Sequence, residues 1–150
     1  MMDQIKELRE ITGAGVMDAK RALEEAAGNM EKAIELIKAK GLARAEEKSE
    51  RKVNSGKVYT YTHAGGIAGS MVEVACETDF VASTPEFEHL CKELALQVVS
   101  MDPKDVDELL AQAYIRDGSK TVDQVVKELV GKTGENIQVI RIARFKLGVK

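Results

Sequence analysis

The hydrophobic pattern of this 150-residue chain first changes its period across a charged stretch at residues 42–55. Before that stretch, apolar residues recur every three or four positions, which is the spacing of amphipathic helices. After it, residues 56–63 are rich in Val, Tyr and Thr, and residues 72–77 alternate apolar and polar side chains, as half-buried strands do. The order of elements predicts an α+β protein, with a helical unit followed by a core that has a small, mainly antiparallel sheet.

The first 41 residues predict three short helices. Asp3 is a candidate N-cap for the first helix, which ends at residues 12–15. The second helix ends at Gly28, and the third covers residues 30–40 with Gly41 as its C′ residue. The apolar positions of the three helices are Ile5, Leu8, Ile11, Val16, Ala19, Ala22, Leu23, Ala26, Ala33, Ile34 and Ile37. Because each helix is too short to be stable alone, residues 1–41 must pack as a bundle, whose small size suits a docking module.

The turn Gly13-Ala14-Gly15 is the notable feature of this bundle. Its small residues would let the backbone of another protein approach closely, and Val16 and Met17 would add adaptable apolar contact. The alternative is that the glycines only form the turn and Met17 belongs to the core.

Residues 42–55 are mostly charged, with both signs and almost no apolar periodicity, which predicts a solvated linker. The alternative is a partly helical segment held by i,i+4 pairs such as Glu47 with Arg51. The basic residues are matched by Glu46, Glu47 and Glu50, so no basic patch for nucleic acid is expected. The whole chain has a formal net charge of −3 and a pI near 5.5, which gives no attraction to nucleic acid or to an anionic membrane.

The predicted core covers residues 56–150. Within it, the stretch from Glu73 to Ser83 is the candidate functional segment. A β-hairpin of residues 56–63 and 67–76 leads to Asp79 and Phe80, which precede a helix that starts around Ser83. A short strand-to-helix connection is held by both neighbours yet lies at the surface, so Phe80 can be pushed into a partner. The alternative is that Phe80 turns into the core and Asp79 caps the helix.

The rest of the core alternates between helix and strand patterns. Apolar residues from Phe87 to Val98 mark a helix that ends near Met101, and a short helix follows at residues 106–110. Residues 113–116 predict a strand closed by a turn at 117–119. The remaining predicted elements are a helix with a capping box of Thr121 and Gln124, ended by Gly131 or Gly134, and a long strand over 136–147 with apolar residues on both faces. Such a strand is expected in a sheet that is covered on both sides.

Metal binding and catalysis find little support in the residue pattern. Cys76 and Cys91 stand fifteen positions apart with no Cys-x-x-Cys pair, and His63 and His89 have no nucleophile or acid at motif spacing. No cofactor or metal is therefore expected, and the protein is not expected to be an enzyme. The absence of a signal peptide and of a long hydrophobic run predicts a cytoplasmic protein with free thiols.

Three motifs give the chain a resemblance to a known family. Residues 6–18 (KELREITGAGVMD), residues 73–82 (EVACETDFVA) and residues 132–137 (KTGENI), with Arg144-Phe145 near the end, resemble bacterial elongation factor Ts in the order of that family. The resemblance spans almost the whole chain. It departs from the family in a short middle, because the family's usual core is longer between the first core helix and the last strands.

The resemblance implies a guanine-nucleotide exchange factor of translation elongation. The N-terminal bundle would be similar to a ubiquitin-associated domain and would dock on GDP-bound or nucleotide-free elongation factor Tu. The residues implied in docking are Thr12, Gly13, Ala14, Gly15, Val16, Met17 and Asp18. The residues implied in displacing the partner's magnesium ion are Thr78, Asp79, Phe80 and Val81. No covalent catalysis is needed for exchange, and short relatives of this kind imply a homodimer. The alternative is a protein-binding adaptor without exchange activity.

Overall fold

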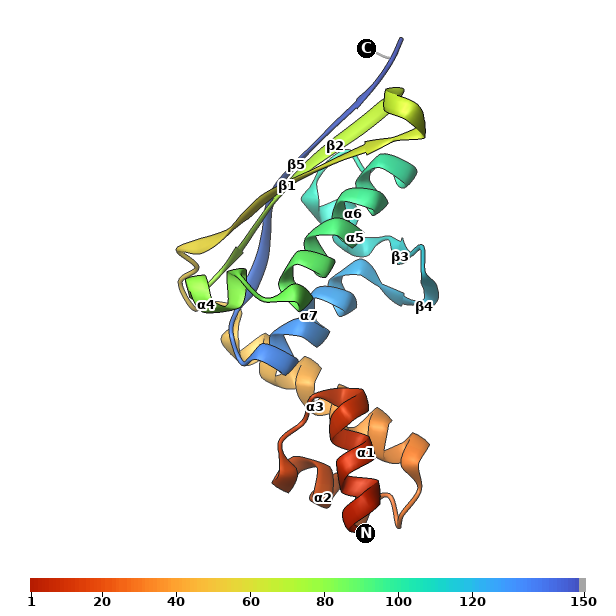
Figure 1. Ribbon diagram of the computed structural model, residues 1–150, viewed down its shortest axis with the longest axis vertical. Coiled ribbons are helices and arrows are strands. Elements are labelled where there is room, and N and C mark those ends of the chain that lie inside the picture. Colours follow the sequence, from red (N-terminus) through yellow and green to blue (C-terminus); the bar gives the residue numbers. More distant parts are fainter. Residues whose placement is uncertain (149–150) are drawn as a thin grey trace.

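The computed structural model describes residues 1–148. Figure 1 shows an elongated molecule with a helical bundle at one end and an α+β core at the other, connected by helix α3. The predicted α+β class, with three N-terminal helices and a small antiparallel sheet, is confirmed.

The bundle consists of α1 (Met2–Thr12), α2 (Val16–Glu25) and the first part of α3 (Met30–Lys48). Its buried residues are Ile5, Leu8, Ala19, Ala22, Leu23, Ala26 and Ala33. Asp3 does not cap α1 as predicted, because the N-cap is Met1, two residues earlier, and Asp3 lies in the first turn. Gly13 ends α1 in the left-handed conformation (φ 71°), as the sequence predicts.

Helix α3 does not end before Gly41 but continues to Lys48, so the predicted helix end is wrong and half of the predicted linker is helical. The reason is tertiary packing, since Gly41 faces Gly131 of α7 (Val122–Thr133). A Cβ atom on Gly131 would lie only 2.9 Å from the Cα atom of Gly41, so the two helices approach more closely than side chains would allow. This contact, together with the burial of Ala45, offsets the cost of about 1 kcal/mol that glycine imposes inside a helix.

The main sheet has three antiparallel strands in the order β1-β2-β5. The predicted hairpin is confirmed: β1 (Ser55–His63) pairs with β2 (Ala68–Cys76) from Ser55 opposite Cys76 to His63 opposite Ala68. A short 3₁₀ turn, η1 (Ala64–Gly66), connects the two strands. β5 (Ile137–Lys146) pairs with the other edge of β2.

Helices cover one face of this sheet, as Figure 1 shows for α5 (Pro85–Met101), α6 (Val106–Ala111) and α7. The N-cap of α5 is Thr84, one residue later than predicted, because the Thr84 hydroxyl accepts the N–H of Phe87. The capping box of Thr121 and Gln124 is confirmed. Gly134, in the left-handed conformation, ends α7.

A separate two-stranded hairpin lies beside α5, formed by β3 (Ala113–Tyr114) and β4 (Asp117–Thr121). The predicted turn at residues 117–119 is wrong, and the chain turns at 115–116 instead. Side chains of α5 determine this position. The Gln97 side chain accepts the N–H of Ile115 at 3.0 Å, and buried Glu93 accepts the Nε–H of Arg116 at 2.8 Å.

The expectation that β5 lies inside the sheet is wrong, and within one described chain helices cover only one of its faces (Figure 1). β5 is an edge strand, and its pairing with β2 shifts register between Glu73 and Val74, which leaves Ile140 as an extra residue. Such a bulge reverses the alternation of side chains along the strand. Ile137 and Val139 are buried before it, whereas Ile142 packs against the core after it. The opposite face of the sheet, which we call the outer face, is not covered by any helix in the described part of the chain (Figure 1).

Candidate functional site

The tip that follows β2 is a single helical turn, α4 (Asp79–Ala82). Thr78 caps it, and its hydroxyl accepts the N–H of Val81 at 3.3 Å. Val81 and Ala82 are buried against the core, whereas the side chain of Phe80 is 82% exposed. The alternative in which Phe80 is a core residue is therefore wrong. Val81 anchors the turn and is not part of its exposed surface.

Asp79 is exposed at the start of this turn, and one of its oxygens, Oδ1, accepts the hydroxyl of Ser55 at 2.9 Å. Asp79 does not cap a helix, since Thr78 caps α4 and Thr84 caps α5. Its carboxylate is thus held in place from β1 and remains open to solvent beside Phe80.

Glu135 and Asn136, which have no assigned role in the sequence motifs, hold the tip through hydrogen bonds from the segment before β5. The Glu135 carboxylate accepts the N–H of Thr78 at 3.0 Å and its hydroxyl at 2.6 Å. The next residue, Asn136, donates its backbone N–H to Glu77 at 2.6 Å. The motif at residues 132–137 was the only signal for them, because partners 57 and 59 positions apart cannot be paired from spacing.

The second predicted surface lies on the bundle, where α1 turns into α2. The Thr12 hydroxyl donates to the carbonyl of Leu8 at 2.6 Å and accepts the N–H of Ala14 at 3.2 Å, which fixes the turn. Gly15 is the N-cap of α2, and Val16 and Met17 follow with their side chains 49% and 57% exposed. The alternative in which Met17 is a core residue is therefore wrong.

Asp18 differs from its neighbours because it pairs within the chain. Both of its oxygens accept the guanidinium of Arg44 on α3, at 3.0 and 3.2 Å. These hydrogen bonds from Arg44 lower the pKa of the Asp18 carboxyl below its usual value. Asp18 therefore ties the start of α2 to the part of α3 that reaches the core.

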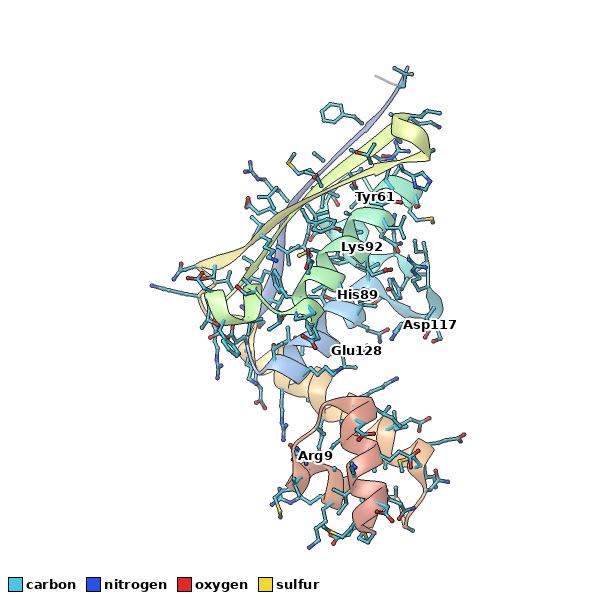
Figure 2. All side chains as sticks on the ribbon, in the orientation of Figure 1. Arg9, Tyr61, His89, Lys92, Asp117 and Glu128 are labelled. Carbon is cyan, nitrogen blue, oxygen red and sulfur yellow. The ribbon has the colours of Figure 1, made fainter. Side chains whose placement is uncertain are left out.

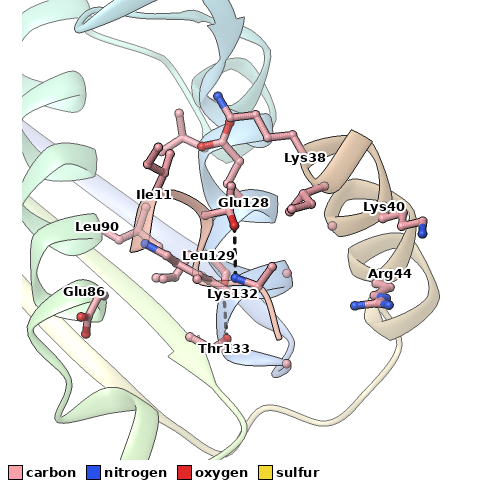
Figure 3. A pocket seen from close by; sticks show the side chains of 18 of the residues that line it. Ile11, Lys38, Lys40, Arg44, Glu86, Leu90, Glu128, Leu129, Lys132 and Thr133 are labelled. Atoms are coloured by element: carbon pink, nitrogen blue, oxygen red, sulfur yellow. Dashed lines mark hydrogen bonds between the residues drawn. The ribbon is translucent and has the colours of Figure 1, made fainter. Parts of the chain in front are cut away.

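A cleft of about 760 Å³ lies between the bundle and the core. Figure 3 shows its walls, with Ile11 of α1 near Leu90 of α5 and Leu129 of α7, and with Lys40 and Arg44 on α3. Residues 12–15 line the same cleft. A Cβ atom on Gly13 would lie 2.7 Å from Cε of Lys132, so the lysine side chain packs directly over this glycine. The turn of the bundle is thus positioned by the core.

The cysteines and histidines do not form a reactive group. Cys76 and Cys91 are buried free thiols, and burial raises the pKa of Cys76 and raises that of Cys91 to about 12. His89 lies on α5 (Figure 2), whereas His63 ends β1 with its Nδ1 atom 3.2 Å from the hydroxyl of Tyr61. Among residues 1–148, no three His, Cys, Asp or Glu side chains are grouped so that they could hold a metal ion.

Within the same described residues, none of the helices is both long enough and apolar enough to cross a membrane.

The two exposed apolar surfaces lie on the same side of the molecule in Figure 1, where the α1–α2 connection and α4 both face left. The Thr78 cap holds α4, and the Thr12 hydroxyl holds the turn before α2. Each surface carries an apolar side chain that the core does not use. Exposed apolar residues on rigid supports are typical of a protein that acts by binding another protein.

Comparison with known proteins identifies the family. A family model described as Elongation factor TS matches residues 77–150. Elongation factor Ts of Thermotoga petrophila is 40% identical over 190 aligned positions, covering 98% of this chain and 96% of the relative. Those of Caldanaerobacter subterraneus (40% over 189 positions, 96% and 94% covered) and Leptospira biflexa (39% over 191 positions, 97% and 96% covered) are similarly related.

The chain belongs to the elongation factor Ts family, a family of translation elongation factors, as the motifs predict. Each alignment is longer than this chain of 150 residues, so the relatives carry positions that it lacks.

Proposed function

We propose that this protein is the guanine-nucleotide exchange factor of elongation factor Tu in the cytoplasm, and that it promotes release of GDP through the tip at residues 78–80. The observation that carries the proposal is Phe80, a large apolar side chain that is 82% exposed on a capped and anchored turn. The Phe80 ring is exposed to water in the free protein and makes no core contact. Its burial by a partner would therefore stabilise the complex.

The proposed chemistry makes and breaks no covalent bond. A magnesium ion in the partner offsets the negative charge of the GDP phosphates, so displacing the ion or its ligands weakens nucleotide binding. Phe80 would insert between elements of the partner near this site. The free lone pairs of Asp79 would accept hydrogen bonds from the partner groups that Phe80 displaces, while Val16 and Met17 would anchor the complex from the bundle.

Exchange factor and adaptor differ in how they respond to nucleotide. Coupling between two binding sites is reciprocal, so a factor that weakens GDP binding must itself bind GDP-loaded partner less tightly. Calorimetric titration of elongation factor Tu with and without GDP tests this difference. We expect the nucleotide-free partner to bind at least about ten-fold more tightly, which is a coupling of about 1.4 kcal/mol. Equal affinities for the two forms would favour the adaptor.

Removal of α1 and α2 is expected to weaken partner binding while leaving the core folded. Because α3 packs on α7 beyond Gly41, a cut at residue 28 keeps this helix whole, whereas a cut at 41 divides it. We expect the truncated chain to retain a cooperative thermal transition and to lose about ten-fold or more in affinity, since it lacks Val16 and Met17. The variant Met17→Asp, which changes one exposed residue, should show part of the same loss. Full affinity of the truncated chain would contradict the docking role of the bundle.

We further propose that two copies of the chain associate through the outer face of the sheet. The strand register brings Thr60, Met71 and Ala143 into one row on this face and Val58, Glu73 and Arg141 into the next. Glu73 accepts the guanidinium of Arg141 at 3.1 Å, so the face carries both signs of charge. In a two-fold contact the patch meets the same patch of the second copy, so it must be self-complementary. A patch with both signs of charge meets this requirement, because Glu73 of one copy can face Arg141 of the other.

Light scattering over a concentration series tests the dimer. We expect a mass of twice the 16.4 kDa chain for the wild type and a shift toward the monomer for Met71→Lys, because a lysine there would be buried opposite its own copy. Ile115→Lys, at an exposed position of the β3–β4 turn, is the matched control and should remain dimeric. A wild-type monomer with full exchange activity at high concentration would exclude the association.

A further inference from the structure

Glu135 holds the residue on which the tip depends. Thr78 is bound twice by the Glu135 carboxylate, through its backbone N–H at 3.0 Å and through its hydroxyl at 2.6 Å. The same hydroxyl accepts the N–H of Val81, so it donates to Glu135 and accepts from the turn at once. Hydrogen bonds to an ionised carboxylate are about twice as strong as those between neutral groups. The cap of α4 is thus fixed from outside the turn.

The direction of Phe80 depends on this cap. α4 has four residues, and an isolated helical turn of that length has no stability of its own. Burial of Val81 and Ala82 secures its far end, whereas Phe80 is exposed and makes no such contact. The backbone of Thr78 and Asp79 therefore decides where the ring of Phe80 points.

The segment that carries Glu135 is itself fixed. Asn136 is 3% exposed, donates its backbone N–H to Glu77 at 2.6 Å, and donates its side-chain amide to the carbonyl of Arg51 at 2.8 Å. A second bond from the same amide reaches the carbonyl of Ser49, just after α3, at 3.3 Å. Residues 135–136 thus connect the tip to the end of the helix that carries the bundle.

We propose that Glu135 is a positioning residue for nucleotide exchange, which holds the tip through Thr78 in the one orientation that allows Phe80 to enter the partner. Its carboxylate acts within the chain and does not need to touch the partner. The proposal rests on the proposed function, since it assigns Glu135 a role only if Phe80 drives the release of GDP.

The variant Glu135→Gln tests the proposal, because it keeps the shape of the side chain, removes its negative charge and leaves one acceptor oxygen where the carboxylate has two. Its matched control is Glu50→Gln, at an exposed site. In the free protein, hydrogen exchange measured by NMR should show the amide proton of Thr78 exchanging at least about ten-fold faster in Glu135→Gln, and unchanged in Glu50→Gln. Equal protection of this proton in wild type and Glu135→Gln would overturn the proposal without any use of the partner.

The second readout is release of labelled GDP at increasing factor concentration. We expect Glu135→Gln to lower the maximal release rate about ten-fold, the factor that one charge-assisted hydrogen bond supplies. The concentration that gives half of this rate should change less than two-fold, since the bundle still docks. Thr78→Val, which removes both the hydroxyl bond to Glu135 and the cap on Val81, should lower the maximal rate at least as much. If Glu135→Gln has a reduced thermal midpoint, the exchange of the Thr78 amide proton in the free protein decides the proposal.

A double variant separates positioning from direct contact. In a Phe80→Ala background, Glu135→Gln should add no further loss, because there is no ring left to position. The same ten-fold loss in both backgrounds would overturn the proposal and make Glu135 an independent partner contact. If Phe80→Ala alone releases GDP at the wild-type rate, the proposed role of the tip fails. If Phe80→Ala is slow and Glu135→Gln is as fast as wild type, only the positioning role fails.

Discussion

Phe80→Ala is expected to slow the stimulated release of GDP at least about ten-fold, which corresponds to about 1.4 kcal/mol of lost transition-state stabilisation. The same change should alter the free energy of unfolding by no more than about 0.5 kcal/mol, as is usual for exposed positions. The reason for this split is that the Phe80 ring is 82% exposed in the free protein, so only the complex loses a contact. Exchange kinetics and a thermal melt of the same preparation give both values.

Phe145→Ala is the matched control, since Phe145 is also a phenylalanine and is 81% exposed, but lies opposite Gly69 on the outer face of the sheet and not at the tip. Its exchange rate per protomer should stay near that of the wild type. A fall in unfolding free energy of roughly 3–5 kcal/mol for Phe80→Ala would show instead that Phe80 is needed by the core.

Gly56→Ala is expected to cause the largest loss of stability of the changes considered for this chain. Gly56 has a φ of 143°, a backbone conformation that side chains disfavour, and a Cβ atom there would lie 2.1 Å from the carbonyl oxygen of Val74 on the central strand. Backbone strain and overlap each cost about 1–3 kcal/mol, so we expect a loss of about 2–6 kcal/mol in unfolding free energy. For a chain of this length that lowers Tm by roughly 4–24 °C.

Gly118→Ala provides the comparison for this substitution. A Cβ atom on Gly118 would have no atom within 4 Å, and its φ lies outside the positive range. The expected change is within about 0.5 kcal/mol. Equal melting temperatures for the two variants would mean that β1 does not pass as close to Val74 as the register indicates. Because Ser55, which holds Asp79, is the neighbour of Gly56, the destabilised variant should also exchange nucleotide more slowly.

The local patterns of the sequence predicted most of the elements, because each depends on residues close in the chain. The hairpin of β1 and β2 follows from alternation and a glycine turn, and the start of α7 from the Thr121–Gln124 capping box. The exposed tip was also found, although its direction was not decided by spacing. Phe80 alone was compatible with a core position, and only the resemblance to elongation factor Ts pointed it outward.

The errors arose where distant residues decide the structure. Gly41 looks like a helix end until Gly131, ninety positions later, is placed against it. The bulge at Ile140 depends on how β5 pairs with β2, which no pattern within β5 specifies. The positioning role proposed for Glu135 also depends on a distant contact, because its hydrogen bond to Thr78 joins residues 57 positions apart. The pairing of the Asp18 carboxylate with Arg44, 26 positions away, likewise could not be seen in the sequence.

The central claim is that the tip at residues 78–80 makes this protein an exchange factor, and release of labelled GDP from purified elongation factor Tu tests it most directly. With excess unlabelled GDP present, a small amount of the protein should release label from many partner molecules in turn, at a rate that rises with its concentration and falls at least about ten-fold for Phe80→Ala. Release at the spontaneous rate at every concentration of wild-type protein, despite measurable binding to the partner, would contradict the account and leave the adaptor in its place.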